Sequence, residues 1–467
     1  MTSSVSPWPK AFTERIRKQF PDAAGAFLDS LLYEARASLR INPLKLRSAH
    51  QARHVPWCST GFFLNERPVY AQDPFWHAGA YYVQEASSMF LEQAFRQIPN
   101  SQPLRVLDLC AAPGGKSTLL LDLLKPDDLL VSNELIRSRL PVLSENLVKW
   151  GRSNVLISNS DARQFGRAGA FFDLLVVDAP CSGEGLFRRN PDACTEWTQE
   201  QADRCSLRQR RILADSWNCL KEGGWLIYST CTFNPAENEE NLRWLQTHAS
   251  VESIRIPLKA EWRIEELEHH GIYGYRFLPH RVQGEGFFMA LLQKTEKAKT
   301  VKASSPRKGR FKKPGRIPSH WISRPENMTF FQHRDRLCFI PVAREADVLS
   351  LLGSVNILKA GTTTGQRVRE QLLPDAGLAL SADLRPEAFA CTELSLQEAL
   401  NYLAREPFPL QVSGAPWQLV SYNGLPLGFI KNLGKRFNNY YPGNWRLRIK
   451  PEPQKNYWYR QGTDQGT

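Results

Sequence analysis

Between residues 104 and 230, short apolar runs alternate with longer segments that have a helical pattern of apolar positions. The runs are continuously apolar rather than alternating in polarity, which is typical of strands buried on both faces of a parallel sheet. They are residues 104–109, 128–133, 153–159, 172–178 and 223–229. Repeated strand, helix and strand units with right-handed crossovers predict an α/β fold with a Rossmann-like, doubly wound sheet.

Three of the intervening segments carry signals of helix ends. Residues 116–125 follow a Gly-Gly turn, residues 137–150 stop at Gly151, and residues 198–221 begin with a capping-box pattern of Thr198 and Gln201. Pro141 falls in the first turn of its helix, where proline is tolerated. Ligands bind such sheets at the carboxyl ends of the strands, and all five predicted strands end in polar residues.

The pattern changes outside this region, and 467 residues predict more than one domain. A core domain is expected over residues 96–294, after an N-terminal α/β extension over residues 1–95. Residues 295–318 have the composition of a basic linker, and a small mixed domain is expected over 319–390. Residues 391–467 predict a β-rich domain, in which Asn423-Gly424 indicates a hairpin.

The positive charge lies in two places. The chain has a formal charge of +13, but residues 1–294 carry 34 basic and 33 acidic residues. Residues 295–316 have nine basic residues and one acidic residue, and residues 431–460 have eight and one. Two positive surfaces on a neutral body are typical of a protein that binds a polyanion, although a solvated linker and a basic tail explain the charge equally well.

The remaining composition predicts a soluble chain. No apolar stretch has the length of a membrane span, and the first residues lack the apolar block of a signal peptide, so we expect a cytoplasmic protein without a membrane partner. We also expect a monomer. The nine cysteines include no Cys-x-x-Cys pair and no Cys/His cluster, which predicts reduced thiols and no metal site.

The stretch "VLDLCAAPGGKS" joins a strand to a glycine turn that opens a helix. It matches neither the Walker loop nor the dinucleotide fingerprint. Asp108 followed by a glycine loop suits a ligand with an ammonium and a carboxylate, as at the amino-acid end of S-adenosyl-L-methionine, although a plain glycine turn remains the alternative. Glu134 is placed to accept hydrogen bonds from ribose hydroxyls, and Asp161 from an adenine amino group.

Two cysteines, Cys181 and Cys231, each follow a predicted buried strand within a turn. A thiolate that attacks carbon 6 of a pyrimidine makes carbon 5 nucleophilic, so carbon 5 can accept an electron-poor methyl group. A second group must then help to remove the proton at carbon 5. Asp178 is placed to bind the protonated ring nitrogen. The alternative is that such cysteines are small buried hydrophobic residues. We apply that interpretation to Cys194, Cys205 and Cys219, and not to Cys181 and Cys231, which lie in turns after strands.

These residues give the chain a resemblance to a known family. "DLCAAPGGKS", "DAPCSGEG" and "YSTCTFNPAENE", together with flanking motifs at 81–89 and 275–294, resemble the Sun-type RNA cytosine-5 methyltransferases. The match is closest to the bacterial RsmF (YebU) group, whose members methylate one cytosine of 16S ribosomal RNA. It covers about residues 75–294. Residues 391–467 are similar to a PUA-like RNA-binding domain, with aromatic side chains that can stack on bases.

The resemblance implies roles for individual residues. It makes the core a class I methyltransferase domain and Cys231 the nucleophile, with Cys181 assisting product release; the reverse assignment of the thiols is the weaker alternative. The implied partner is ribosomal RNA, within the small ribosomal subunit. The implied S-adenosyl-L-methionine site consists of Cys110, Ala111, Ala112, Pro113, Gly114, Gly115, Lys116, Glu134, Asp161 and Asp178.

Two other functions stay open on the sequence. One is a transfer RNA cytosine-5 methyltransferase, since PUA-like domains also serve that class of RNA. The other is a non-catalytic RNA-binding protein that keeps this fold for ribosome assembly, in which we would expect a thiol or the glycine loop to be lost. Both thiols and the loop are present here.

Overall fold

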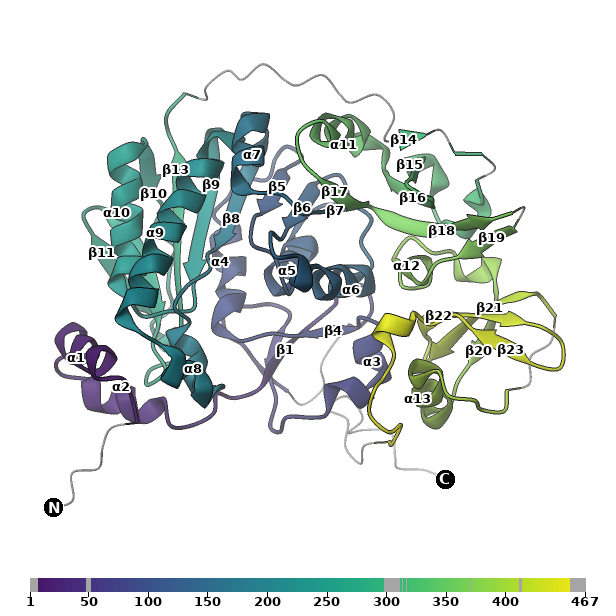
Figure 1. Ribbon diagram of the computed structural model, residues 1–467, viewed down its shortest axis with the longest axis horizontal. Helices are drawn as coiled ribbons and strands as arrows, with labels where there is room; N and C mark the ends of the chain where they lie inside the picture. The colour runs from purple at the N-terminus through teal and green to yellow at the C-terminus, as the bar shows by residue number, and fades with distance from the viewer. Residues whose placement is uncertain are drawn as a thin grey trace.

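The computed structural model describes residues 7–47, 52–297, 311–312, 314–315, 317–369, 371–410 and 414–453. Figure 1 shows one central sheet flanked by helices, with smaller sheets beside it. Most of the predicted linker, residues 298–310, 313 and 316, lies outside the described residues, as does the end of the basic tail from residue 454.

The central sheet contains the five predicted strands side by side, in the order β7-β6-β5-β8-β9, and all four pairings between them are parallel. This confirms the α/β prediction. The direction of chain progression reverses between β5 and β8, so the loops after these two strands lie at the switch point where such sheets bind ligands. The strands are β5 (Arg105–Asp108), β6 (Leu129–Asn133), β7 (Val155–Ser158), β8 (Phe172–Asp178) and β9 (Leu220–Thr230).

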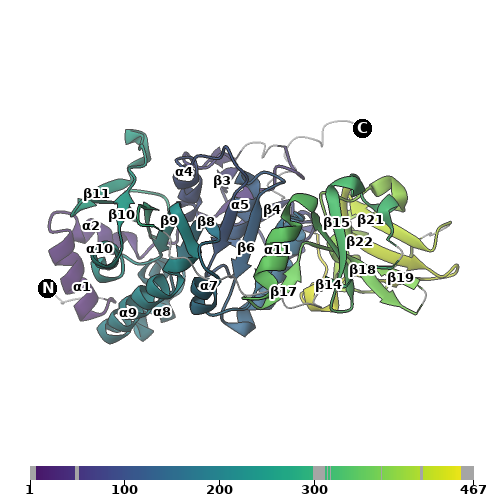
Figure 2. The same ribbon diagram turned by 90° about the horizontal axis from the view of Figure 1, so that it is seen from above.

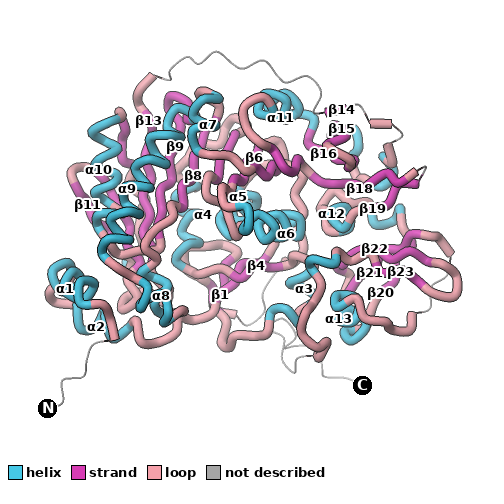
Figure 3. The backbone as a smooth tube through the Cα atoms, viewed as in Figure 1, coloured by secondary structure: helices cyan, strands magenta, loops and turns pink. Residues whose placement is uncertain are grey.

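Helices cover both faces of this sheet (Figure 3). Alternate strand residues point to opposite faces, so Val106 and Leu107 of β5 belong to two different apolar cores. The core around Val106 includes α4 (Leu91–Phe95), α5 (Gly115–Leu123) and α6 (Leu140–Trp150). The core around Leu107 includes α7 (Ala162–Ala168), α9 (Gln199–Ser216), α10 (Glu239–His248) and α11 (Glu345–Leu352).

The helix predictions agree with the structure except at one end. Pro141 lies in the first turn of α6, and Gly151 ends that helix with a φ of 89°. The predicted helix over residues 198–221 was too long, because α9 ends at Ser216 and a short 3-10 turn follows. Leu220 already pairs with Phe172 of β8, so its backbone hydrogen bonds go to the sheet rather than to a helix.

Antiparallel strands complete both edges of the sheet. On one side, β9 pairs with β13 (Phe287–Lys294), which is followed by β12 (Ile272–Phe277) and β11 (Glu265–His269), while β10 (Val251–Ser253) also pairs with β13. On the other side, β17 (Ile357–Ala360) pairs with β7. Residues that follow the linker therefore build part of the central sheet.

The N-terminal residues form helices and a small sheet. The helices are α1 (Lys10–Gln19), α2 (Ala24–Ser30) and α3 (Pro74–His77), with α8 (Pro191–Glu196) packed near the first two. The strands are β1 (Ser38–Ile41), β2 (Arg53–His54), β3 (Gly61–Phe63) and β4 (Tyr81–Val83). Helix α2 ends at Ser30, and β1 begins at Ser38.

Two further sheets follow the linker. The first contains β14 (Phe311–Lys312), β15 (Met328–His333), β16 (Arg336–Pro341), β18 (Thr362–Val368) and β19 (Gln371–Pro374), with α12 (Ala376–Ala379) beside it. The second contains β20 (Ala390–Glu393), β21 (Trp417–Tyr422), β22 (Leu425–Asn432) and β23 (Phe437–Asn439), with α13 (Leu396–Ala404). The hairpin at Asn423-Gly424 is confirmed, and both turn residues have positive φ.

Seen from above, helix α1 and the C-terminal sheets lie at opposite ends of an elongated molecule (Figure 2). The N-terminal sheet and the C-terminal domain nevertheless share an apolar core, in which Leu39 and Phe62 belong to the same cluster as Leu400 and Val420. Within the described ranges, every helix is too short or too polar to cross a lipid bilayer.

Candidate active site

The predicted glycine turn and the two predicted cysteines lie on segments that leave β5, β8 and β9 at the same edge of the central sheet. The loop after β5 begins at Cys110 and leads into α5 through Gly114, which has a φ of 114° that favours glycine. The loop after β8 carries Cys181, and the loop after β9 carries Cys231. The parallel order of the strands therefore brings three distant sequence motifs together.

The two cysteines of the predicted pair are in contact. The Sγ atoms of Cys181 and Cys231 lie 3.3 Å apart, and the backbone N–H of Gly185 donates to the Cys231 carbonyl over 2.8 Å. The hydrogen bond to Cys231 and burial raise the pKa of the Cys181 thiol. Either sulfur can donate the hydrogen of this contact, so the geometry brings the two thiols together without distinguishing their roles.

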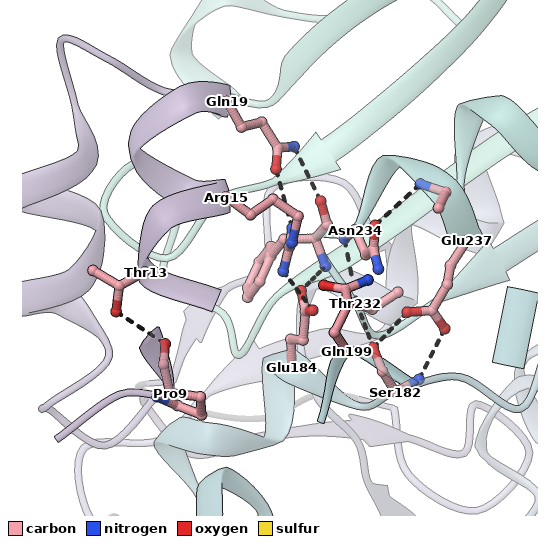
Figure 4. A network of polar contacts seen from close by, with 12 residues as sticks. Pro9, Thr13, Arg15, Gln19, Ser182, Glu184, Gln199, Thr232, Asn234 and Glu237 are labelled. Atoms are coloured by element: carbon pink, nitrogen blue, oxygen red, sulfur yellow. Dashed lines mark hydrogen bonds and ion pairs between the residues drawn. The ribbon is translucent and has the colours of Figure 1, made fainter. Parts of the chain in front are cut away.

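A buried carboxylate holds the loop of Cys181. Glu237 accepts hydrogen bonds from the Ser182 backbone N–H at 2.9 Å and from the Ser182 hydroxyl at 2.5 Å (Figure 4). The Gln209 side-chain amide also donates to Glu237, over 3.0 Å. Burial raises the pKa of Glu237, although the Ser182 donors oppose the shift. Glu237 is not among the residues predicted for the site, and its only signal in the sequence is its position within the "NPAENE" part of the second cysteine motif.

Asp178 and Lys116 form an ion pair beside the thiols. Lys116 Nζ lies 2.8 Å from one Asp178 carboxylate oxygen, and the Ser229 hydroxyl donates to the other over 2.8 Å. Burial alone would lower the pKa of Lys116, but the attraction of Asp178 outweighs it and raises that pKa. Lys116 also lies 5.0 Å from the centre of the Phe287 ring, a cation–π distance. The pair places a fixed cation and a fixed anion at one wall of the site.

A cavity of about 260 Å³ opens between these loops. Its wall includes Asp108 and Asp178 from the central sheet, Lys116 from α5 and Cys231 from the loop after β9. The N-terminal extension adds Tyr82, Val83, Gln84, Glu85 and Ser88, and further residues come from the loops: Cys110, Ala111, Ala112, Pro113, Gly115, Gly185, Leu186, Arg189, Glu285, Gly286 and Phe287. Arg189 and Glu285 are not among the residues predicted for the site. The flanking motifs at 81–89 and 275–294 are the signal in the sequence for Gln84, Glu85 and Glu285.

Asp108 has the properties of a ligand-binding carboxylate. Its side chain is completely buried, and one oxygen accepts a hydrogen bond from the Ser117 hydroxyl over 2.6 Å. The other oxygen, Oδ1, has no hydrogen-bond partner within the described part of the chain. Burial raises the pKa of Asp108 to about 7. A cationic donor in the cavity would satisfy the free oxygen, so this wall fits the ammonium group of an amino acid.

Glu134 and Asp161 lie at the ends of β6 and β7, outside the wall of this cavity. Glu134 is buried, accepts the Ile136 backbone N–H over 2.8 Å and lies 3.3 Å from the Arg139 guanidinium. Asp161 caps helix α7 and accepts the Arg163 backbone N–H at 3.0 Å. Hydrogen bonds from Arg163 lower the pKa of Asp161. Both carboxylates are thus held in place at the same sheet edge as the thiols.

Three families match successive parts of the chain. Residues 98–293 match the family described as "16S rRNA methyltransferase RsmB/F". Residues 8–86 match the "N-terminal domain of 16S rRNA methyltransferase RsmF". Residues 389–447 match the "Methyltransferase RsmF PUA domain". The three matches follow the order of the N-terminal extension, the central sheet and the last β-rich region.

Relatives of similar length are also found. The chain is 32% identical to proteins named "Ribosomal RNA small subunit methyltransferase F" from Escherichia coli strain K12 and from Shigella boydii serotype 4. Each alignment spans 470 residues, 93% of this chain and 96% of the relative. The similarity therefore includes the parts outside the central sheet.

Solved structures with the same core come from Pyrococcus horikoshii. A methyltransferase homolog protein from this organism is 29% identical, with a TM-score of 0.53, and the match covers 62% of this chain and 95% of that protein. NSun6 from the same organism, solved with SFG, has a TM-score of 0.53 at 20% identity, covering 62% of this chain and 99% of that one. The second likeness supports the fold alone.

Proposed function

Because the chain belongs to the RsmF family of 16S rRNA methyltransferases, we propose that it methylates carbon 5 of one cytidine in 16S ribosomal RNA. The methyl donor is S-adenosyl-L-methionine, and a cysteine forms a transient covalent bond to the base. One observation carries the proposal: Cys181 and Cys231 meet at 3.3 Å next to a cavity walled by Asp108, Lys116 and Asp178.

The loop after β5 is assigned to the methyl donor. Asp108 binds the ammonium group through its unpartnered Oδ1, while the turn from Cys110 to Lys116 holds the remainder of the amino-acid end. Glu134 and Asp161 are assigned to the ribose hydroxyls and the adenine amino group, as their positions after β6 and β7 allow. When bound, the donor supplies an electrophilic methyl group.

Cys231 starts the reaction. Its thiolate adds to carbon 6 of the cytosine ring, and the electron pair of the ring double bond becomes available at carbon 5 for the incoming methyl group. A carbon–sulfur bond forms at carbon 6 and a carbon–carbon bond forms at carbon 5. The bond between the methyl group and the sulfonium of the donor breaks, and S-adenosylhomocysteine leaves with that electron pair. Asp178 holds the proton on the ring nitrogen and stabilises the adduct, and Lys116 keeps the Asp178 carboxylate in position at 2.8 Å.

Release of the product requires a base. The proton on carbon 5 is removed, its electron pair restores the ring double bond, and the bond between carbon 6 and Cys231 sulfur breaks. Cys181 is assigned to this stage, because its sulfur lies next to the sulfur that must leave. We assign the C-terminal domain to binding the surrounding ribosomal RNA, through exposed basic residues and stacking aromatic side chains.

Two cysteine variants test the mechanism. We expect Cys231→Ala to abolish methyl transfer to a 16S RNA substrate while binding S-adenosylhomocysteine with unchanged affinity in calorimetry. We expect Cys181→Ala to accumulate a covalent protein–RNA adduct, visible as a slowly migrating band on a denaturing gel. Cys219→Ala serves as the control, because that thiol is completely buried in an apolar core and lies outside the cavity.

The outcomes separate the roles of the two thiols. Turnover by Cys231→Ala at the wild-type rate would overturn its assignment as nucleophile. Free product release by Cys181→Ala would remove its role in resolving the adduct. Sequencing 5-methylcytidine in cellular 16S RNA with and without the protein identifies the modified position.

A further inference from the structure

Helix α1 contacts the loop that carries Cys231, although it lies far from that loop in sequence. The Glu184 carboxylate stands between them: one oxygen lies 2.5 Å from Arg15 Nη2, and the other accepts the Phe233 backbone N–H over 3.1 Å (Figure 4). Gln19, one turn after Arg15, donates to the Phe233 carbonyl over 3.0 Å. The Phe233 carbonyl is thus bonded directly to α1, and the Phe233 N–H is linked to α1 through Glu184.

The same network contacts the two reactive loops, which are the loops that carry Cys181 and Cys231. Glu184 lies three residues after Cys181, and Phe233 lies two residues after Cys231. The next residue, Gly185, donates its N–H to the Cys231 carbonyl, and a Cβ at Gly185 would stand only 2.9 Å from that oxygen. Because the two loops are packed this closely, a shift of the Glu184 carboxylate moves the backbone next to the nucleophile.

Arg15 is the counter-charge of Glu184. The Glu184 side chain is fully buried, and among the described residues Arg15 is the only cation within ion-pair distance of it. A buried carboxylate without a counter-charge is unstable and either takes up a proton or moves toward water. Arg15 itself is fixed, since it also donates to Gln19 at 3.2 Å and lies 5.4 Å from the centre of the Phe12 ring.

Helix α1 is a stable support for this contact. Its buried residues Phe12 and Ile16 belong to an apolar cluster that also contains Phe187 and Phe233 from the two reactive loops. The Phe233 ring in turn packs edge-to-face on Phe27 of α2, with ring centres 4.8 Å apart. Arg15 lies outside the cavity wall, so any effect on the reaction must pass through Glu184 and Phe233.

We propose that Arg15 is a positioning residue, which, through Glu184, holds the Phe233 backbone and thereby aims the Cys231 sulfur at the target base. The N-terminal helix is on this view part of the catalytic apparatus and not only a covering element. The inference rests on the proposed function, because it assumes that Cys231 is the nucleophile.

The test is a pair of matched substitutions on α1. Arg15→Met removes the charge at similar length, and Arg17→Met makes the same change at an exposed position of the same helix. Each variant is made in the full chain and, separately, in the Cys181→Ala background, where adduct formation reports the nucleophilic step directly. A displacement of about 1 Å at a reacting group reduces rates by about 100-fold. We therefore expect Arg15→Met to slow kcat and adduct formation by about that factor.

A positioning role and a general structural role predict changes in different measured quantities. We expect the KM for RNA and the affinity for S-adenosylhomocysteine to stay within about two-fold for Arg15→Met, and Arg15→Lys to recover most of the rate by restoring the charge. Arg17→Met should match the wild type in every assay. If the melting curve shows that Arg15→Met fails to fold, Gln19→Leu replaces it in the test. This variant removes the hydrogen bond to the Phe233 carbonyl without changing a charge, and we expect a rate loss of about 10-fold.

Each result decides the question. The positioning role would be overturned if Arg15→Met formed the adduct as fast as Arg17→Met. If Arg15→Met is unfolded, the same comparison is made with Gln19→Leu. A rate loss that Arg15→Lys does not recover would also overturn it, because the charge would then be irrelevant. A wild-type protein that transfers no methyl group to RNA would instead refute the proposed function.

Discussion

Asp108 illustrates what a single buried residue decides in this protein. It ends β5 without any exposed surface, with one carboxylate oxygen bonded to Ser117 and the other without a partner in the described part of the chain. Its pKa is raised to about 7 because burial disfavours the charged form. The residue therefore changes its charge near neutral pH, at the position assigned to the ammonium group of the methyl donor.

This shift predicts how the affinity for the donor depends on pH. Above about pH 7 the carboxylate is charged and attracts the ammonium group, whereas below that value it is protonated and the attraction is lost. We expect the Kd for S-adenosylhomocysteine, measured by calorimetry, to rise as the pH falls from 8 to 6, a range about one unit on either side of the pKa. Asp108→Asn should bind about 10–100-fold more weakly, since a hydrogen bond to a charged group contributes about 1.5–3 kcal/mol, and without this pH dependence.

At the scale of elements, helix ends determine how the added domains attach to the core. Gly151 ends α6 with a φ of 89°, and its carbonyl accepts the backbone N–H of Ala382 over 2.9 Å. A Cβ at this position would stand 2.3 Å from the Leu380 carbonyl oxygen. The turn therefore serves both as a helix end and as the contact between the catalytic sheet and the region that follows the linker.

A pair of glycine substitutions separates these two roles. Gly223 also has positive φ, but a Cβ there meets nothing within 4 Å. We expect Gly223→Ala to reduce the free energy of unfolding by about 1 kcal/mol, the cost of the backbone conformation. Gly151→Ala should reduce it by roughly 3 kcal/mol, because the backbone contact must also open. Urea titration measures both, and equal losses would argue that the close contact is unimportant.

At the scale of the molecule, the N- and C-terminal regions are joined. The extension is itself tied to the core, because Asn42, the residue after β1, donates to the carbonyls of Gly79 and of Trp150 at the end of α6, over 3.0 and 2.9 Å. His77 of α3 lies 2.8 Å from the Tyr441 hydroxyl of the C-terminal domain. The His77–Tyr441 contact and the shared apolar core hold the C-terminal domain against the N-terminal extension.

The exposed basic residues of the C-terminal domain should contribute to binding of RNA. Affinity for a 16S RNA fragment, measured by fluorescence anisotropy, should fall with salt by about 0.7 logarithmic units for each phosphate contact and each tenfold rise in salt. Lys435→Ala combined with Arg436→Ala should lower that slope by about 1.4, whereas Arg204→Ala combined with Arg211→Ala on the exposed face of α9 should not. An affinity independent of salt would contradict a role for these charges.

The hydrophobic pattern by itself determined the five strands and three of the helices between them, because each strand is a continuous apolar run. Local signals marked some helix ends, as Gly151 does at the end of α6, whereas α9 ends at Ser216, before its predicted glycine stop. The pattern also placed both cysteines directly after strands, since that requires only the positions where the apolar runs end. The Asn423-Gly424 hairpin was equally predictable, because its turn needs positive φ at both residues.

Tertiary structure alone decided the contacts between segments that are distant in the chain. No local pattern indicates that Arg15 pairs with Glu184, that Glu237 holds Ser182, or that β17 extends the sheet of β7. The strand order also set the distance between the two sulfurs, because β8 and β9 are neighbours and their loops must meet. Local sequence encodes where each element begins and ends, whereas the neighbours of an element depend on how all the apolar faces are buried together.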